Sequence, residues 1–205
     1  MHIADGVLPT AVAVGCYVCT LAGIGLILRR LDHRELPKIA VVTSSFFVAS
    51  LIHLPLGPTS VHLLLPGLVG ALLGPAALLS ISVGLFLQSL LFQFGGLTAL
   101  GANSLMMGLP ALLCGLAFRR WRGTSKTSNT VVGGLLSGLG VLLSALLLAL
   151  LLASGGDSFF GVAKLAVVAH LPVMVVEGLV SGFVIAFLFR VKPELLGSRQ
   201  AGRRP

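Results

Sequence analysis

Residues 61–94 read VHLLLPGLVGALLGPAALLSISVGLFLQSLLFQF, and they contain no Asp, Glu, Lys or Arg. A single helix of this length would measure about 50 Å at 1.5 Å per residue, which is too long for the roughly 30 Å hydrocarbon core of a bilayer. The Gly74-Pro75 pair disfavours helix before the proline and allows a new helix to begin at the proline. The stretch therefore predicts two membrane spans with a break at Gly74-Pro75.

The whole chain is as apolar as this stretch. Its 205 residues are 56% hydrophobic and 10% charged, and the mean hydropathy is +1.06. Soluble globular proteins carry about 25% charged residues, so this composition predicts an integral membrane protein. The net charge of +8 does not indicate nucleic-acid binding, because the basic residues flank apolar runs and do not alternate with aromatic residues on a soluble face.

Charges and helix breakers divide the chain into seven apolar runs, which predicts an all-α bundle of seven transmembrane helices. We expect a single domain over residues 1–205 and a multi-pass location in the cell (inner) membrane. The expected spans are residues 7–28, 39–56, 61–73, 75–94, 98–118, 130–153 and 162–189, followed by a cytoplasmic tail at 190–205.

The basic residues give an independent check on this count. Thirteen of the 14 fall in three clusters, at residues 29–38, 119–126 and 190–204. With seven spans and the N-terminus outside, all three clusters lie in the cytoplasm, as the positive-inside rule requires. With six spans they would fall on opposite sides of the membrane, so the charges favour seven spans and a cytoplasmic C-terminus.

The first span carries small residues at four-residue spacing, a pattern that lets another helix approach closely in lipid. These residues are Ala11, Gly15, Cys19 and Gly23. The stripe could pack within the same chain or dock another membrane subunit, and the sequence leaves both open. No G-x-x-x-x-G-K-[ST] motif is present, so the chain does not carry a P-loop ATPase site.

The opening dipeptide Met1-His2 offers three nitrogen ligands: the α-amine, the His2 peptide nitrogen and the His2 Nδ1. Peptide nitrogen binds only when a strongly polarising ion displaces its proton, and a flat three-nitrogen set suits square-planar Ni(II) or Cu(II). Zn(II) prefers a tetrahedron. No basic residue precedes the first apolar run, which is compatible with an unprocessed N-terminus. The alternative is a frayed terminus with an incidental histidine.

The predicted topology limits the source of a fourth nitrogen to histidines near the outer side. His53 precedes the break LPLGP, whereas His62 follows Pro-Thr-Ser, where Thr59 or Ser60 could cap a helix. We therefore expect His62 on the first turn of a helix and prefer it as the ligand. His53 is expected to be a structural histidine or one that supports a ligand.

His170 and Glu177 are seven residues apart, so a continuous helix would place them on one face. A membrane-embedded metalloenzyme could use this pair beside His62. However, H-E-x-x-H is absent and one His-Glu pair supplies too few zinc ligands. Polar contacts between helices are the preferred interpretation.

Three segments carry a resemblance to a known family. MHIADGVLP (1–9), LPLGPTSVHLLLPGLVGALLGP (54–75) and QSLLFQFGGLTALGANSLMMG (88–108) resemble the substrate-binding membrane subunits, or S components, of nickel and cobalt energy-coupling-factor (ECF) transporters of the CbiM/NikM type. The resemblance spans most of the chain. It implies a seven-helix fold with an inserted N-terminus and a metal ligand set of Met1, His2 and His62.

The resemblance also implies supporting residues and partners. It suggests that FGGLTALGAN forms a lid over the metal, with Gln88 and Asn103 as hydrogen-bonding supports and His53 and Ser60 as further candidates. His53 stands where the family pattern leads us to expect Asn, and Gly57-Pro58 replaces a glycine pair. The implied partners are a transmembrane coupling (T) subunit, cytoplasmic ATPase subunits and often one further small membrane protein, for which the stripe on the first span would be a docking face.

The sequence therefore predicts a nickel-capturing S component that is not itself an enzyme and relies on its partners for ATP hydrolysis. Cobalt is the close alternative, and copper is chemically possible. A membrane metalloenzyme and a membrane scaffold without a ligand are the rival classes.

Overall fold

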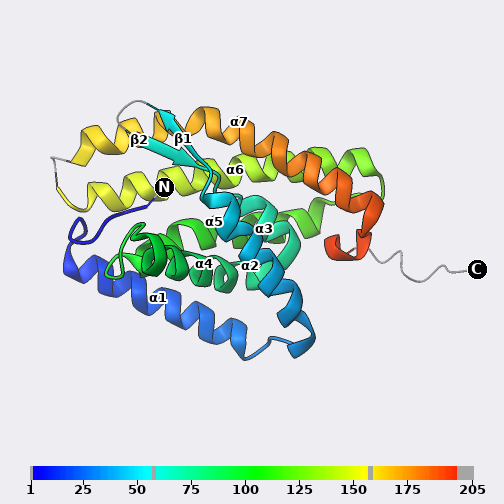
Figure 1. Cartoon of the computed structure of the whole chain (residues 1–205), viewed down its shortest axis with the longest axis horizontal. Helices are drawn as coiled ribbons and strands as arrows, with labels where there is room; N and C mark the ends of the chain where they lie inside the picture. The colour runs from blue at the N-terminus through cyan, green and yellow to red at the C-terminus, as the bar shows by residue number, and fades with distance from the viewer. Residues whose placement is uncertain (1, 57–58, 157–158, 198–205) are drawn as a thin grey trace, which may run out of the picture.

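The computed structural model describes residues 2–56, 59–156 and 159–197, and between 53 and 62 it describes the backbone alone. Most of its long helices run roughly along the long axis of the molecule (Figure 1). They are α1 (Thr10–Leu28), α2 (Leu36–Ser50), α3 (Pro66–Leu73), α4 (Ala77–Phe92), α5 (Leu100–Trp121), α6 (Lys126–Ala153) and α7 (Phe160–Val191). The shorter elements are strands β1 (His53–Leu56) and β2 (Thr59–His62) and the 3-10 helices η1 (His33–Glu35), η2 (Gly74–Ala76) and η4 (Pro193–Leu196).

The described part of the chain is helical apart from one β-hairpin. Five helical segments within it are long and apolar enough to cross a membrane: Thr10–Leu28, Pro66–Phe92, Leu100–Trp121, Lys126–Ala153 and Phe160–Val191. The 15-residue helix α2 measures only about 22 Å at 1.5 Å per residue, and α3 has eight residues. The structure therefore confirms a multi-pass helical protein, whereas seven full crossings stay a prediction.

The boundaries of the second and third expected spans are wrong. Helix α2 ends at Ser50, and α3 begins only at Pro66. Between them β1 and β2 pair antiparallel, with the Cα atoms of His53 and His62 opposite each other. Pro55 has no backbone N–H to donate to a helical ladder, which disfavours a continued helix through this stretch.

This hairpin changes the expected context of His62. The residue ends β2 and does not lie on the first turn of a helix, and Thr59 and Ser60 lie in the strand and do not cap a helix. The other expected spans differ from the observed helices by no more than four residues at either end.

The predicted break at Gly74-Pro75 is confirmed. Gly74 has φ +56°, a conformation that side-chain-bearing residues rarely adopt, and it begins the 3-10 turn η2. A Cβ at Gly74 would collide with the guanidinium group of Arg119 on α5. The turn sends the chain back along the bundle, so α3 and α4 are separate helices.

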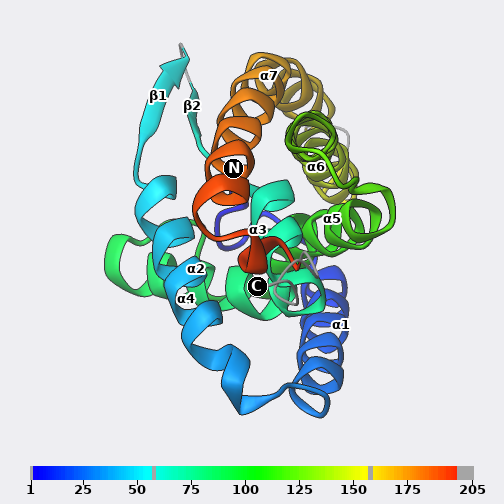
Figure 2. The same ribbon diagram turned by 90° about the vertical axis from the view of Figure 1, so that its right-hand side faces the viewer.

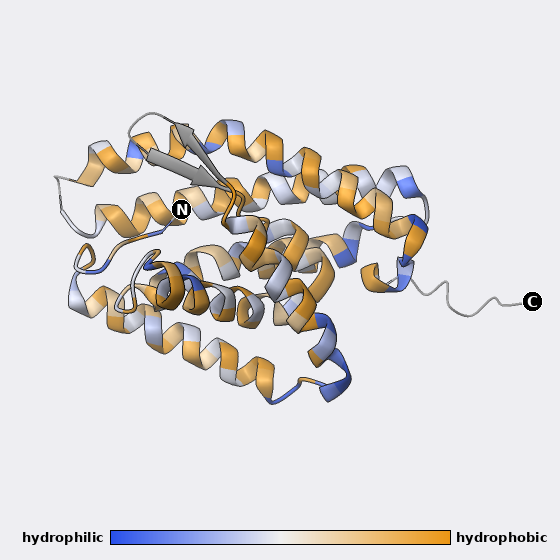
Figure 3. Cartoon of the chain, viewed as in Figure 1, coloured by the Kyte–Doolittle hydropathy of each residue, from blue (hydrophilic) through white to orange (hydrophobic). Residues whose placement is uncertain are grey.

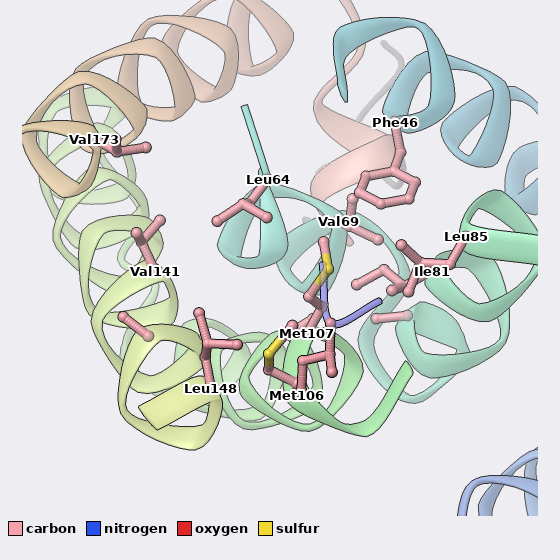
Figure 4. Close-up of a cluster of buried hydrophobic side chains, with 14 of the residues drawn as sticks. Phe46, Leu64, Val69, Ile81, Leu85, Met106, Met107, Val141, Leu148 and Val173 are labelled. Atoms are coloured by element: carbon pink, nitrogen blue, oxygen red, sulfur yellow. The ribbon is translucent and has the colours of Figure 1, made fainter. Parts of the chain in front are cut away.

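Helix α3 lies at the centre of the molecule (Figure 2), and all of its residues except Leu72 are buried. Helices α6 and α7 run side by side along one flank (Figure 1). The core contains the fully buried side chains of Met106 and Met107 on α5, and α3 approaches α5 closely. Figure 4 shows side chains of α2 and α4 and side chains of α6 and α7 facing this centre from two sides.

Basic residues gather at one end of the bundle. Figure 3 shows the hydrophilic segments between α1 and α2 and around the ends of α5 and α7 at that end. Lys38 at the start of α2 donates hydrogen bonds to the carbonyl oxygens of Leu72 at 2.6 Å and Leu195 at 2.9 Å, and Arg122 donates to the carbonyl of Leu196. The described residues of the three basic clusters, which in the third are Arg190 and Lys192, thus share an end of the structure.

Candidate functional site

The N-terminal segment enters the centre of the bundle (Figure 2). Ile3 is 2% exposed and belongs to the core cluster. Asn103 on α5 holds its backbone from both sides, because Oδ1 accepts from the Ile3 N–H at 2.9 Å and Nδ2 donates to the Ile3 carbonyl at 3.0 Å. Buried backbone groups need such partners, so this pair fixes where the start of the chain lies.

The imidazole of His2 begins a chain of hydrogen bonds across α4 and α2. Its Nε2 lies 2.9 Å from Gln88 Oε1, the Gln88 Nε2 donates to Ser50 Oγ at 2.5 Å, and Ser50 Oγ donates to the Phe47 carbonyl at 2.6 Å. Along this chain each donor points away from His2: the Gln88 amide donates to Ser50, and the Ser50 hydroxyl donates to Phe47. With the Gln88 amide oxygen facing His2, we assign the donated proton of the neutral imidazole to Nε2, which makes Nδ1 the nitrogen able to bind a metal.

A glycine-rich loop after α4 covers this region. Gly95 and Gly96 have φ +85° and +113°, and a Cβ at Gly96 would collide with the Asp5 carboxylate. Asp5 Oδ1 accepts hydrogen bonds from the Thr98 hydroxyl at 2.5 Å, the Thr98 N–H at 2.8 Å and the Ala99 N–H at 3.3 Å. The Thr98 hydroxyl bond above all holds the pKa of the Asp5 carboxyl below its ordinary value.

Asp5 belongs to the opening motif, but sequence reasoning assigned it no role at the site. The available signal in the sequence was the position of Asp5 between the opening Met1-His2 pair and Gly6. However, an exposed carboxylate near a terminus is ordinarily solvated, so this position alone did not indicate a role. Helix α5 begins at Leu100 with no side-chain cap, and the hydroxyl of nearby Thr98 bonds to Asp5.

A second polar cluster joins α7 to the chain after the hairpin. Glu177 is fully buried and accepts hydrogen bonds from the backbone N–H groups of Leu64 and Leu65, the latter at 2.8 Å. Leu65 has φ +47°, a left-handed conformation that is uncommon for a residue other than glycine, and it precedes α3. Glu177 therefore bonds to backbone just before α3, and among the described residues it hydrogen-bonds to no side chain of another helix.

His170 lies two turns before Glu177 on α7 and is 6% exposed. Its Nδ1 donates to the Ala166 carbonyl at 2.6 Å, and its Nε2 has no hydrogen-bond partner among the described residues. Nor do three His, Cys, Asp or Glu side chains come together as a metal-binding group in the described part of the chain.

The predicted site residues divide into three groups. Gln88 and Asn103 contact the N-terminal segment, as described above. Met1 lies outside the described residues, and for His53, Ser60 and His62 only the backbone is described. The ligand set and the supporting roles therefore stay predictions.

The small-residue stripe of α1 packs little against its own chain. Ala11, Gly15 and Cys19 are exposed, and a Cβ at Gly15 would meet no atom within 4 Å among the described residues. Only Gly23 lies against the bundle, where a Cβ would approach Leu78 Cδ2 to 2.8 Å. Most of the stripe is thus available to lipid or to another protein.

Comparisons with known proteins agree with this geometry. The chain is 36% identical to a putative metal transport protein of Haemophilus influenzae over 96% of its own length and 97% of the relative's. It is 31% identical to the fused nickel transport protein NikMN of Rhodobacter capsulatus, covering 100% of this chain and 66% of that protein. A crystal structure of a transition metal transporter matches with a TM-score of 0.76 and 25% identity, covering 99% of this chain and 100% of that one. The model of the CbiM family, the cobalt uptake substrate-specific transmembrane region, matches residues 2–195, and the chain therefore belongs to the CbiM family.

Proposed function

We propose that this protein is the substrate-binding S component of an ATP-driven ECF importer and that it captures Ni(II) at the outer face of the membrane. Membership of the CbiM family makes the chain a multi-pass inner-membrane transport protein and not an enzyme. The family description names cobalt, whereas the Rhodobacter relative is named for nickel. Co(II) is accordingly the alternative cargo for the same site.

The proposed ligands are the Met1 amine, the His2 peptide nitrogen, the His2 Nδ1 and the His62 imidazole. The observation that carries this proposal is the contact between His2 Nε2 and Gln88 Oε1 at 2.9 Å. Chelation through the His2 side chain and peptide nitrogen closes a six-membered ring only through Nδ1, and the hydrogen bond to Gln88 occupies Nε2. Partners of this kind orient a ligating histidine and fix its tautomer.

The donor set also limits the metal. Displacing the peptide proton requires a strongly polarising ion, and four nitrogens in a plane suit Ni(II), with Cu(II) chemically possible. Co(II) would be bound less tightly in this geometry. Binding releases protons, so metal affinity should fall in acid.

The hairpin register leaves His53 and His62 as neighbouring candidates for the fourth nitrogen, because their Cα atoms are opposite each other. We assign the ligand to His62 because the family pattern has a histidine after the Pro-Thr-Ser stretch. Replacing each histidine by alanine separately tests this assignment. The His62 variant should lose metal affinity, and the His53 variant should retain most of it.

The proposed orientation puts the N-terminal end of the bundle outside and the basic end in the cytoplasm, in line with the positive-inside rule. Residues 1–205 then form one substrate-binding domain with a cytoplasmic tail at 190–205. The proposed partners are a transmembrane coupling (T) subunit, cytoplasmic ATPase subunits that hydrolyse ATP, and one further small membrane subunit. The exposed stripe of Ala11, Gly15 and Cys19 is a candidate docking face for a membrane partner.

Isothermal titration of the purified protein with Ni(II), Co(II) and Cu(II) tests the proposal. The protein is compared with a variant that has one residue added before Met1 and with a matched variant that has one residue added after Pro205. The N-terminal addition leaves every side chain in place but removes the terminal amine from the chelate, so affinity should collapse in that variant alone. Unchanged affinity would show that the terminal chelate does not exist.

A further inference from the structure

We propose that Glu177 is a positioning residue for metal capture, which holds the end of the β-hairpin so that His62 meets the metal. This inference rests on the proposed function, because it takes His62 as the fourth ligand. It assigns Glu177 a role other than the polar contact between helices that the sequence predicts.

The contacts of Glu177 reach the chain immediately after β2. Strand β2 ends at His62, and the N–H groups of Leu64 and Leu65 donate to the two oxygens of the Glu177 carboxylate. Helix α7 also lies against β2 and α3. One buried side chain therefore ties the join between the hairpin and α3 to the long helix α7.

The join needs such a tie. Leu65 adopts a left-handed backbone conformation that costs energy for any residue with a Cβ, and it persists only where the surroundings over-determine it. The Leu65 carbonyl accepts the Val69 N–H at 3.0 Å, which closes the first turn of α3. Glu177 satisfies the N–H groups on the other side of this residue, so the direction from which the chain enters α3 depends on it.

His62 is two residues from Leu64, so its Cα lies within about 7 Å of the clamped backbone. A planar four-nitrogen site tolerates errors in ligand distance of only about 0.2 Å. A small shift of the join thus suffices to move His62 out of the plane. The hydrogen bonds to Glu177 act on the metal through His62, and Glu177 itself supplies no ligand.

A matched control lies one turn further along α7. Ser181 is fully buried like Glu177, and its hydroxyl pairs with the Ser137 hydroxyl of α6 at 2.6 Å. Ser181→Ala removes a buried polar contact of the same helix without touching the hairpin. It should lower the thermal stability of the protein and leave metal affinity unchanged.

The test compares Ni(II) titrations and the visible absorption of bound Ni(II) in the full-length protein. Glu177→Gln keeps one accepting oxygen but turns an NH₂ group towards the second N–H, so we expect affinity to fall roughly tenfold to a hundredfold, the usual range for a lost ligand support. The absorption band should shift towards that of the His62→Ala variant. Glu177→Asp withdraws the carboxylate by about one methylene and should change both the affinity and the absorption in the same direction. This variant replaces Glu177→Gln in the test if the glutamine variant does not fold.

The double variant of Glu177→Gln with His62→Ala separates positioning from general destabilisation. If Glu177 acts through His62, the double variant should bind no more weakly than His62→Ala alone. An equal further loss in the double variant, or native affinity and absorption in Glu177→Gln, would overturn the inference. The residue added before Met1 distinguishes the two proposals: if that addition abolishes binding while Glu177→Gln has no effect, the chelate stands and only the positioning role fails.

Discussion

Replacing Asn103 by leucine should release the N-terminal segment while preserving the volume of the side chain. Asn103 is 2% exposed and makes both of its hydrogen bonds to the backbone of Ile3. Leucine fills nearly the same space but neither donates nor accepts. The Ile3 N–H and carbonyl would then be buried without partners or exposed by undocking of the segment.

The magnitude follows from those two bonds. Each neutral hydrogen bond contributes about 1 kcal/mol net, so losing both weakens docking by about 2 kcal/mol. At about 1.4 kcal/mol per factor of ten, this is roughly a thirtyfold change in the docking equilibrium. The buried Ile3 side chain contributes about 1.5–3 kcal/mol. This is less than the cost of ordering the segment, at about 1–2 kcal/mol per residue, so without the two bonds the segment is mostly undocked. Because apparent affinity scales with the competent fraction, Ni(II) binding should fall roughly tenfold to thirtyfold.

Titration calorimetry of the Asn103→Leu variant with Ni(II) measures this loss. Ser104→Ala on the same helix is the control, since Ser104 is 1% exposed and its hydroxyl has no hydrogen-bond partner in the described structure. The control should bind Ni(II) like the native protein. If Asn103→Leu also binds with native affinity, Asn103 only fills space, and the clamp on Ile3 has no part in metal capture.

Two further predictions concern the glycine-rich loop and the core. Because the folded pKa of Asp5 is lowered, its bonds to Thr98 stabilise the loop above the ordinary aspartate pKa and are lost as the pH falls through the lowered value. The protection factor of the Thr98 amide, which is its exchange rate relative to the intrinsic rate at the same pH, should therefore be constant near neutrality and fall only in acid. Asp5→Asn should lower this protection factor at neutral pH, and an unchanged factor would show that the bond does not hold the loop. Gly70→Ala should destabilise the protein by about 1–3 kcal/mol in thermal unfolding, because the new Cβ would collide with the Ala111 carbonyl across the α3–α5 contact. Gly161→Ala on α7 meets nothing within 4 Å among the described residues and should be neutral or slightly stabilising, so equal effects at the two sites would contradict the packing argument.

Those parts of the fold that depend on apolar length and charge were predictable from sequence. Long uncharged runs must be helical in lipid because no water satisfies their backbone, and the Gly74-Pro75 pair marked the break in the longest run. The shared end of the described residues of the three basic clusters followed from their spacing along the chain. These features are local or depend only on counting spans.

The hairpin could not be predicted in the same way. Residues 53–62 are apolar enough to read as the ends of two spans, and their strand pairing depends on contacts with each other and with α7. The clamp by Asn103 and the bond from Gln88 to His2 join residues separated by 100 and 86 positions. Resemblance to a family suggested these residues, but spacing alone did not. Glu177 was noticed as an ionisable group in a span, while its backbone partners could be found only in three dimensions.

The way the N-terminal segment is held explains why an added residue tests chelation and not folding. Asn103 bonds only to the backbone of Ile3, so the clamp does not depend on what precedes that residue. The Ile3 side chain is buried in the core, which fixes its place in the register. An extra residue before Met1 therefore leaves the docked segment intact and moves only the amine away from the proposed metal position. A loss of affinity without a loss of thermal stability would then come from the missing nitrogen, because the contacts described for this segment, by His2, Ile3 and Asp5, would be kept.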